Sequence, residues 1–253
     1  MSVKIIQITD LHIDVEGESP FDIDVRQNFL KIIDKVKALK PEHLVISGDL
    51  CYRDGDENIY QWIKEVVDKT QIPYSVISGN HDDSNLLAKT FELEHLMTDD
   101  ELFYAKKIGK STFLFLDSSR GYHSAKQLKW LKRQLKNAKD DLFVFMHHPP
   151  ILAGVPFMDR EYALQDIKAV QDIFFDYPKN ISIFTGHYHV EKSIRINNLL
   201  IDITPSLFFQ IDQESDEFKV DHHHIALREI VLQNNHFSST LKYFSGFKKY
   251  PGS

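Results

Sequence analysis

The sequence predicts an α/β fold in which a parallel or mixed β-sheet is covered by helices. Three observations support this class. Short apolar runs alternate with segments of helical periodicity through the first part of the chain. Several of these runs end in glycine or polar residues, as strands do where they meet a loop. After residue 190 the pattern changes to short apolar runs with Asn-containing turns, which predicts strands alone.

The first third of the chain alternates strand and helix. An apolar run that is too short for a helix indicates a buried strand. Apolar residues three and four positions apart indicate a helix, and Pro41 ends the first of these. Strands are therefore expected at 3–8, 43–47 and 74–78, and helices at 22–39 and 58–69.

The rest of the chain adds a hairpin, two helices and a strand-rich end. Gly109 and Lys110 join the hairpin strands, and Ser124 is the expected N-cap of a helix. Strands are expected at 102–108, 111–116, 142–146 and 181–185, and helices at 124–138 and 162–176. The last strands are expected at 190–196, 199–203, 207–211, 225–232 and 237–243, with turns at Asn197-Asn198 and Asn234-Asn235. No linker or repeat interrupts the pattern, so we expect one domain over residues 1–253.

Composition and charge narrow the possible functions. The net charge of −7 disfavours binding to nucleic-acid polymers or anionic membranes. Cys51 is the one cysteine, so no disulfide can form within the chain. The sequence has neither a signal-peptide pattern nor an apolar run near the roughly 18 residues of a membrane span. We therefore expect a soluble, cytoplasmic protein with no membrane span.

Residues of the kind that bind metals follow five of the expected strands. Asp10 and His12 end the first strand, and their i, i+2 spacing points both side chains to the same side. Sites in open α/β sheets form beyond the carboxyl ends of the strands, where residues far apart in sequence meet. The full set is Asp10, His12, Gly48-Asp49, Gly79-Asn80-His81-Asp82, His147-His148, Gly186-His187 and His189.

The donors in these clusters are carboxylates, imidazoles and one amide, without a thiolate. Such a set favours Mn, Fe, Co, Ni or Zn over softer metals. It offers more donors than one tetrahedral site uses, and two metals roughly 3.5–4 Å apart with a bridging carboxylate would accommodate them. The glycines at positions 48, 79 and 186 are expected to let the backbone turn sharply after each strand.

The clusters resemble the motifs of the calcineurin-like metallophosphoesterase superfamily. The order D-x-H, G-D, G-N-H-D, H-H and G-H-x-H is the same and spans residues 10–189. The compact G-N-H-D cluster, with Thr204-Pro205-Ser206 and Gln210, is most similar to the class III cyclic-nucleotide phosphodiesterase and glycerophosphodiesterase branch. The resemblance implies a four-layer α-β-β-α sandwich of two mixed β-sheets flanked by helices. The chain from about residue 190 would complete the second sheet.

The resemblance also implies a role for each residue of the site. The first metal would be held by Asp10, His12, Asp49 and His189. The second would be held by Asp49, Asn80, His147 and His187, so that Asp49 forms the bridge. His81 would face the scissile phosphate as a proton donor or charge stabiliser. The cofactors expected are two divalent transition-metal ions, Mn²⁺ or iron first, with Zn²⁺, Co²⁺ and Ni²⁺ as alternatives.

Neighbouring residues are expected to do other work. His148 should point away from His147 and support the site, and Asp82 should orient His81 or cap a helix. The tract His222-His223-His224 resembles a metal-binding run but equally fits a polar strand start. Two interpretations stay open for Arg53 and Arg120, which could contact a phosphate or lie on the surface. Phe208 and Phe209 could line a substrate pocket or pack in the core.

The chemistry expected of such a site is phosphoester hydrolysis. The first hypothesis is a phosphodiesterase acting on a small diester such as 3′,5′-cyclic AMP, and a phosphomonoesterase using the same metals is the alternative. The third hypothesis is a non-catalytic scaffold, because some members of the superfamily, such as a retromer subunit, keep the fold without catalysis. Every ligand position and His81 are present here, which argues against a scaffold.

Overall fold

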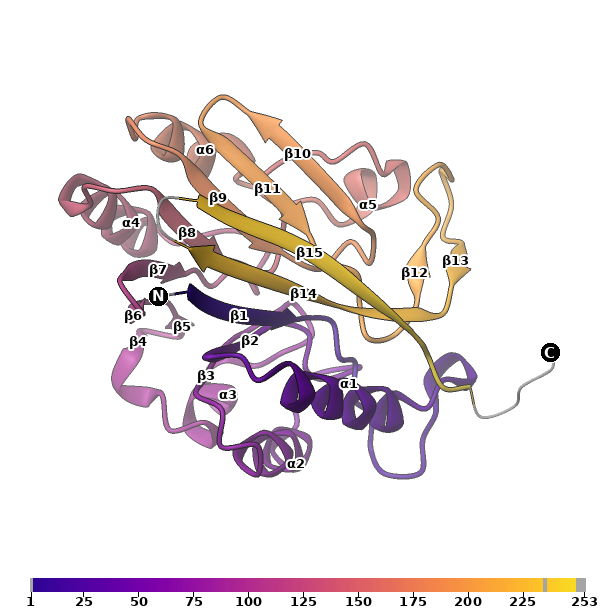
Figure 1. The fold of residues 1–253 in the computed structure, drawn as a ribbon. Coiled ribbons are helices and arrows are strands. Elements are labelled where there is room, and N and C mark those ends of the chain that lie inside the picture. Colours follow the sequence, from indigo (N-terminus) through magenta and orange to yellow (C-terminus); the bar gives the residue numbers. More distant parts are fainter. Residues whose placement is uncertain (1, 234–235, 249–253) are drawn as a thin grey trace.

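Two β-sheets lie face to face at the centre of the fold, with helices on their outer sides (Figure 1). The computed structural model describes residues 2–233 and 236–248. The first sheet has the order β15 (His236–Ser245), β14 (His224–Gln233), β1 (Ser2–Ile8), β2 (His43–Ser47) and β3 (Tyr74–Ile77). The second has the order β10 (Lys192–Ile196), β11 (Leu199–Ile203), β9 (Ile181–Thr185), β8 (Leu142–Phe145), β7 (Ser111–Phe115) and β6 (Tyr104–Ile108). Two short pairs join β4 (Met97–Thr98) to β5 (Glu101–Leu102) and β12 (Gln210–Ile211) to β13 (Val220–His222).

The helices divide between the two outer sides. On the side of the first sheet lie α1 (Val25–Leu39), α2 (Glu57–Asp68) and α3 (Ser84–Thr90), and on the side of the second lie α4 (Ala125–Asn137) and α6 (Ile167–Phe175) (Figure 1). The short helices are α5 (Pro156–Glu161) and the 3₁₀ turns η1 (Pro20–Asp22) and η2 (Glu94–Leu96). No helix in the described ranges is both long and apolar enough to cross a lipid bilayer. With two sheets at the centre and helices on both outer sides, the predicted α-β-β-α arrangement is confirmed.

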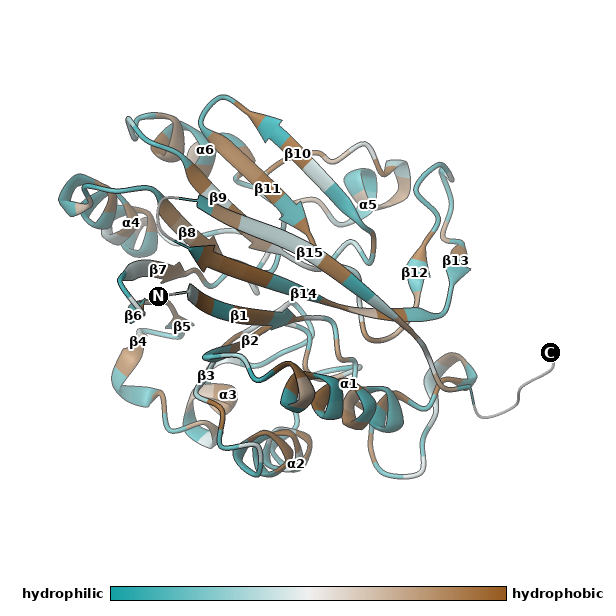
Figure 2. Cartoon of the chain, viewed as in Figure 1, coloured by the Kyte–Doolittle hydropathy of each residue, from teal (hydrophilic) through white to brown (hydrophobic). Residues whose placement is uncertain are grey.

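Strand β8 shows how the second sheet is buried on both faces. Phe143 and Phe145 belong to the core between the two sheets, whereas Leu142 and Val144 pack in a second core that includes residues of α4 and α6. Successive side chains of a strand point to opposite faces, so a strand covered on both sides is apolar throughout. In the first sheet, Figure 2 shows that the inner strand β14 is largely hydrophobic, whereas the edge strand β15 is paler.

Most predicted elements are present, with local corrections. The strands at 43–47, 181–185 and 199–203 match β2, β9 and β11, and Ser124 caps α4 by accepting a hydrogen bond from the Gln127 amide at 3.1 Å. The helix expected at 162–176 begins only at Ile167, and a separate helix, α5, precedes it with Pro156 in its first turn. Helix α3 was not predicted. The turn expected at Asn234-Asn235 lies outside the described residues.

We expected the strand-rich end of the chain to complete the second sheet, but it contributes strands to both sheets. Strands β10 and β11 do complete that sheet, but β14 and β15 form a long antiparallel hairpin on the first sheet. β14 pairs with β1 over six residues, from Ser2↔Gln233 to Gln7↔Arg228. Of the expected strand at 207–211, Gln210–Ile211 is a strand. The apolar pattern of a strand predicts which face it buries but not which neighbour it pairs with.

Candidate metal centre

The five predicted clusters lie in loops at the carboxyl ends of β1, β2, β3, β8 and β9. Strands β1 to β3 are parallel, as are β8 and β9, so within each sheet these ends share one edge. Backbone hydrogen bonds join the loops: the Asp10 amide donates to the Gly48 carbonyl and the Gly186 amide to the His147 carbonyl, each at 3.0 Å. Of the seven predicted ligands, Asn80 is exposed, and the buried ones are Asp10, His12, Asp49, His147, His187 and His189.

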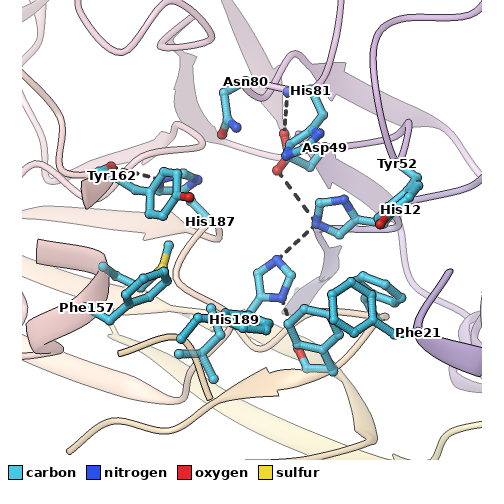
Figure 3. Close-up of a pocket in the computed structure, with 15 residues that line it drawn as sticks. His12, Phe21, Asp49, Tyr52, Asn80, His81, Phe157, Tyr162, His187 and His189 are labelled. Atoms are coloured by element: carbon cyan, nitrogen blue, oxygen red, sulfur yellow. Dashed lines mark hydrogen bonds and ion pairs between the residues drawn. The ribbon is translucent and has the colours of Figure 1, made fainter. Parts of the chain in front are cut away.

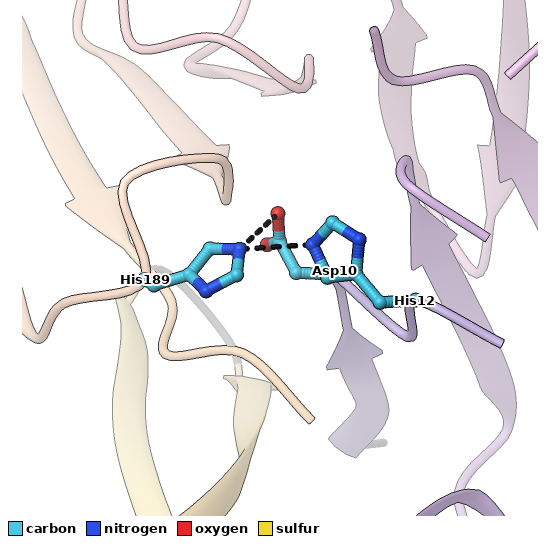
Figure 4. Close-up of side chains that lie close together, drawn as sticks. All are labelled: Asp10, His12 and His189. Carbon is cyan, nitrogen blue, oxygen red and sulfur yellow. Dashed lines mark hydrogen bonds and ion pairs between the residues drawn. The ribbon is translucent and has the colours of Figure 1, made fainter. Parts of the chain in front are cut away.

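One group of possible ligands contains Asp10, His12 and His189, whose donor atoms all lie within 4.8 Å of one another (Figure 4). His189 Nε2 is 3.4 Å from Asp10 Oδ1 and 3.0 Å from His12 Nε2. The other ring nitrogen of His189, Nδ1, is 3.0 Å from the Phe209 carbonyl, to which it donates. This contact fixes the tautomer and leaves the Nε2 lone pair facing the group.

A second group contains Asp49, His147 and His187. His147 donates from Nδ1 to the Ser47 carbonyl at 3.0 Å, which turns Nε2 toward Asp49 Oδ2 at 3.3 Å. His187 donates from Nε2 to the Tyr162 carbonyl at 2.9 Å, so its free donor is Nδ1. Both imidazoles are thus held by a backbone carbonyl in the manner of metal-binding histidines.

Asp49 lies between the two groups. Its Oδ2 is 3.3 Å from His147 Nε2 and 3.7 Å from His12 Nε2. Its other carboxylate oxygen accepts a hydrogen bond from the backbone amide of His81 at 2.9 Å. The carboxylate therefore faces possible ligands from both groups, as the bridging role requires.

The electrostatics of the centre favour a cation. Burial opposes the charge on Asp10, but His189 and His147 lower its pKa to about 2, and Asp49 is likewise held ionised beside His147, with a pKa well below its usual range. Burial also opposes a charge on His147, yet the Asp49 and Asp10 carboxylates raise its pKa to about 9. Burial lowers the pKa of His12 to about 3, so this imidazole is neutral, as a metal ligand must be.

These residues fit a pair of transition-metal ions. Donor atoms that share a metal at about 2.0–2.2 Å lie roughly 2.8–3.6 Å from one another. The contacts of 3.0, 3.3 and 3.4 Å among His12, His189, Asp10, His147 and Asp49 fall in that range. His147 Nε2 is buried and has no hydrogen-bond partner among the described residues. A metal would satisfy this atom and neutralise the two carboxylates.

Five of the seven predicted ligands have a left-handed backbone. The φ angles are 52° at Asp10, 46° at His12, 51° at Asp49, 67° at His187 and 52° at His189. A positive φ is uncommon outside glycine, and such strain gathers at functional sites. The backbone is thus held in an unfavourable form where these side chains converge.

The glycines of the motifs serve two different purposes. Gly48 has a φ of +101° and fits the predicted sharp turn. Gly79 and Gly186 do not have a positive φ, so the backbone at these two positions does not need the conformational freedom of glycine. A side chain at Gly79 would collide with Asp49, and one at Gly186 would collide with Thr9 and Asp10. These two positions are small because the carboxylates occupy the space.

His81 borders the centre from the loop after β3, next to Asn80 (Figure 3). Its Nδ1 donates to the Arg53 carbonyl at 2.9 Å, which leaves Nε2 as the free nitrogen. Its ring centroid is 5.1 Å from that of His12. A donor atom of His81 also lies within 4.8 Å of donors on His12 and Asp49, so its position is compatible with either chemistry or metal binding.

Asp82 ties two motif loops together. Its carboxylate accepts hydrogen bonds from the amides of Gly79 at 2.9 Å and Leu50 at 3.1 Å, and from the Tyr60 hydroxyl at 3.0 Å. Burial, with the nearby Asp49 charge, raises the pKa of Asp82 to about 6. Among the described residues, Asp82 therefore joins the loop that contains His81 to the loop after β2 without a hydrogen bond to His81 itself, and the cap of α3 is the next residue, Asp83.

His148 has a supporting position as well. Its Nδ1 is hydrogen-bonded to the Ser118 hydroxyl at 3.0 Å, and its ring centroid is 4.0 Å from that of His187. The His222-His223-His224 tract spans the end of β13 and the start of β14, and none of the three is among the described residues that border the centre.

A cavity of 390 Å³ opens directly on the centre (Figure 3). Its wall is largely aromatic, and none of the described residues that line it is a lysine or an arginine, so neither Arg53 nor Arg120 is part of the lining. Phe208 and Phe209 satisfy both interpretations, because they are buried and line the cavity. Sequence reasoning missed the remaining lining residues, which come from loops, short helices and the two-residue strand β12: Phe21, Tyr52, Phe157, Met158, Tyr162, Ile211 and Phe218.

Comparisons with known proteins agree with this geometry. A probable cyclic nucleotide phosphodiesterase of Fibrobacter succinogenes is 33% identical over 243 residues, covering 96% of this chain and 94% of that protein. The 3′,5′-cyclic adenosine monophosphate phosphodiesterase of Vibrio vulnificus is 25% identical, covering 92% of this chain and 87% of its own. A probable glycerophosphodiester phosphodiesterase of Arcobacter nitrofigilis is 27% identical, covering 78% and 76%.

The fold is shared with solved structures of low sequence identity. A dimetal phosphatase from Danio rerio superposes with a TM-score of 0.66 at 14% identity, covering 96% of this chain and 99% of that one. The model of the family described as calcineurin-like phosphoesterase matches residues 3–191, which contain all five motifs. From the motif order, the fold and these matches together, the chain belongs to the calcineurin-like phosphoesterase family.

Proposed function

We propose that this protein is a phosphodiesterase that uses two metal ions to hydrolyse a small phosphodiester such as a 3′,5′-cyclic nucleotide. The observation that supports it most is the convergence of two buried ligand groups on Asp49 beside a largely aromatic cavity. In this proposal one metal is held by Asp10, His12, Asp49 and His189. The other is held by Asp49, Asn80, His147 and His187.

The chemistry that such ions supply, when bound, is neutralisation of the phosphate charge and acidification of a water molecule. The protein holds their ligands rigidly through the carbonyls of Ser47, Phe209 and Tyr162. His81 keeps one proton on Nδ1, against the Arg53 carbonyl, and presents Nε2 to the cavity. A second proton on that nitrogen would go to the oxygen that leaves phosphorus, as general acid catalysis requires.

The cavity favours a diester over a monoester. A diester phosphate carries one negative charge, whereas a monoester at neutral pH carries close to two. No lysine or arginine among the described residues lines the cavity to balance the second charge. The second charge of a monoester would have to be balanced by the metals alone, so the monoesterase is the second candidate.

The relatives support the same choice. Those compared above carry the names of cyclic-nucleotide and glycerophosphodiester phosphodiesterases. The presence of every predicted ligand and His81 disfavours a non-catalytic scaffold. The carboxylate and imidazole donors favour Mn²⁺ or iron, and the single reduced cysteine fits a cytoplasmic location.

The test is metal analysis of the purified protein combined with a substrate panel. We expect about two metal ions per chain and faster hydrolysis of bis-p-nitrophenyl phosphate than of the mono ester, followed by hydrolysis of 3′,5′-cyclic AMP. Preference for the mono ester would replace the proposal with the second candidate. Absence of hydrolysis with both metals bound would favour the scaffold.

A further inference from the structure

Six aromatic residues form one continuous surface of the cavity, and Figure 3 labels three of them, Phe21, Phe157 and Tyr162. They come from four separate segments and are here named the aromatic wall: Phe21, Phe157, Tyr162, Phe208, Phe209 and Phe218. Neighbouring ring centroids along the wall are 5.6 Å apart for Phe157 and Tyr162, 5.8 Å for Phe157 and Phe218, and 5.9 Å for Phe21 and Phe218.

The aromatic wall is in direct contact with the candidate metal ligands. The Phe208 ring centroid is 5.3 Å from that of His12, and the Phe209 centroid is 5.3 Å from that of His189. A molecule whose phosphate lies at the centre would therefore have its remaining part against these rings. The wall is a feature of the substrate site and is not a separate surface.

Phe21 is held in a strained, left-handed backbone although about half of its surface stays exposed. Its φ and ψ are 52° and 31°, and the next residue, Asp22, has a φ of 57°. A bulky residue in this region is an outlier, and burial would be the usual compensation. Yet 51% of Phe21 is exposed, as are 49% of Tyr162 and 44% of Phe218. Strain that places an exposed ring at a cavity points to a ligand.

The polar groups near the wall are few and unselective. Apart from the candidate ligands and His81, the hydroxyls of Tyr52 and Tyr162 supply the polar side-chain atoms of the described lining. A phenol hydroxyl can both donate and accept a hydrogen bond. An acyl chain would gain nothing from these groups, whereas the edge of a heteroaromatic ring can bond to them whichever base it belongs to.

Building on the phosphodiesterase function proposed above, we propose that the aromatic wall binds the base of a cyclic nucleotide by stacking, without distinguishing which base it is. Stacking on aromatic side chains tolerates every base because every base has a π face. A site that reads one base needs fixed donors and acceptors, and such sites reject the wrong partner by about 10⁴–10⁵-fold. Among the described residues of the wall, the hydroxyl of Tyr162 is the polar side-chain group, and it can serve either as donor or as acceptor.

The test measures binding to the Mn²⁺-loaded protein by calorimetry, separately from hydrolysis. The probes are 5′-AMP and ribose 5-phosphate, which differ only in the base. Stacking of one base is worth about 5- to 150-fold in affinity, so wild-type protein should prefer AMP by that factor. Phe21→Ala and Phe218→Ala should each reduce the preference, and the double variant should bring it close to one. AMP, GMP and CMP should bind within about tenfold of one another.

Phe247→Ala is the matched control, because Phe247 is also a phenylalanine, is 41% exposed and lies outside the cavity lining. It should bind as wild type does. Equal binding of AMP and ribose 5-phosphate by wild-type protein would overturn the proposal, as would a preference above about 100-fold for one base. Tighter binding of lysophosphatidic acid than of AMP, lost in Phe21→Ala, would identify an acyl chain as the occupant instead. Intact base preference without hydrolysis of any diester would refute the phosphodiesterase and leave the base site standing.

Discussion

Replacing Gly79 with alanine should weaken metal binding at the candidate centre while leaving the fold in place. The added methyl carbon would lie 2.9 Å from Cγ of Asp49 and closer still to its carboxylate oxygen and backbone amide. Carbon atoms prefer about 3.5–4.0 Å, so the Asp49 carboxylate must retreat by roughly 0.6–1.1 Å. The Asp49 backbone cannot follow freely, because its carbonyl accepts the His12 amide at 3.0 Å.

The expected magnitudes follow from that displacement. A misplacement of about 1 Å costs on the order of 10²-fold in rate. Overpacking of this kind costs about 1–3 kcal/mol, or roughly 2–12 °C in melting temperature for a chain of this size. Gly79→Ala should therefore fold, melt somewhat earlier, bind fewer than two ions and lose about 100-fold in diesterase kcat.

The assays are metal content by mass spectrometry, thermal melting and diester kinetics. Gly154→Ala is the control, because Gly154 has a φ of +70° but an added methyl would meet only Lys192 Nζ at an ordinary 3.7 Å. It should lose about 1–2 kcal/mol of stability from left-handed strain and keep its metals and its kcat. Two bound metals and full activity in Gly79→Ala would show that Gly79 is not needed for space.

Four further results are expected. Asp49→Ala should lose both ions in metal analysis, because both groups face its carboxylate; retention of two ions refutes the bridge. Chelated protein should be reactivated better by Mn²⁺ or Co²⁺ than by Mg²⁺, which binds imidazole poorly; full activity with Mg²⁺ alone contradicts the proposed ligands. His81→Ala should keep both metals and lose about 10²–10⁴-fold on a cyclic nucleotide but much less on a nitrophenyl ester, whose leaving group needs no proton; equal losses would make His81 a charge stabiliser. Burial and nearby Lys106 lower the pKa of His43 to about 3. Below about pH 6.5, His43 is therefore protonated in the unfolded chain but neutral in the folded one, so the free energy of unfolding should fall on acidification. Urea unfolding should show a smaller fall in His43→Gln.

The parts of the fold that depend on local pattern were predictable. Apolar runs such as the one before Asp10, and helical spacing such as that after Ser124, determine their own secondary structure. The pairing of β14 with β1 was not predictable, because the same alternating strand could join either sheet. The start of α6 at Ile167 was missed because an apolar pattern continues across the break that follows Tyr162.

The candidate site also has a part that the sequence predicts and a part that it does not. Its polar residues were predictable because each follows a strand, and parallel strands bring their carboxyl ends together. The aromatic wall was not, because Phe21 lies in a 3₁₀ turn, Phe157 in a six-residue helix and Phe218 between two short strands. No periodic signal links these three positions, and only the complete tertiary structure brings them to one cavity.

The left-handed backbone at Asp10, His12, Asp49, His187 and His189 restricts how these positions can change in evolution. Aspartate, asparagine and histidine are the residues, after glycine, that occupy this region most readily. Glutamate supplies the same carboxylate as aspartate but lacks that conformational tolerance. Each of these side chains must both bind the metal and tolerate a positive φ. Few substitutions meet both requirements, even where another residue could supply the same metal donor. Asp→Asn is the exchange that alters the charge and spares the backbone.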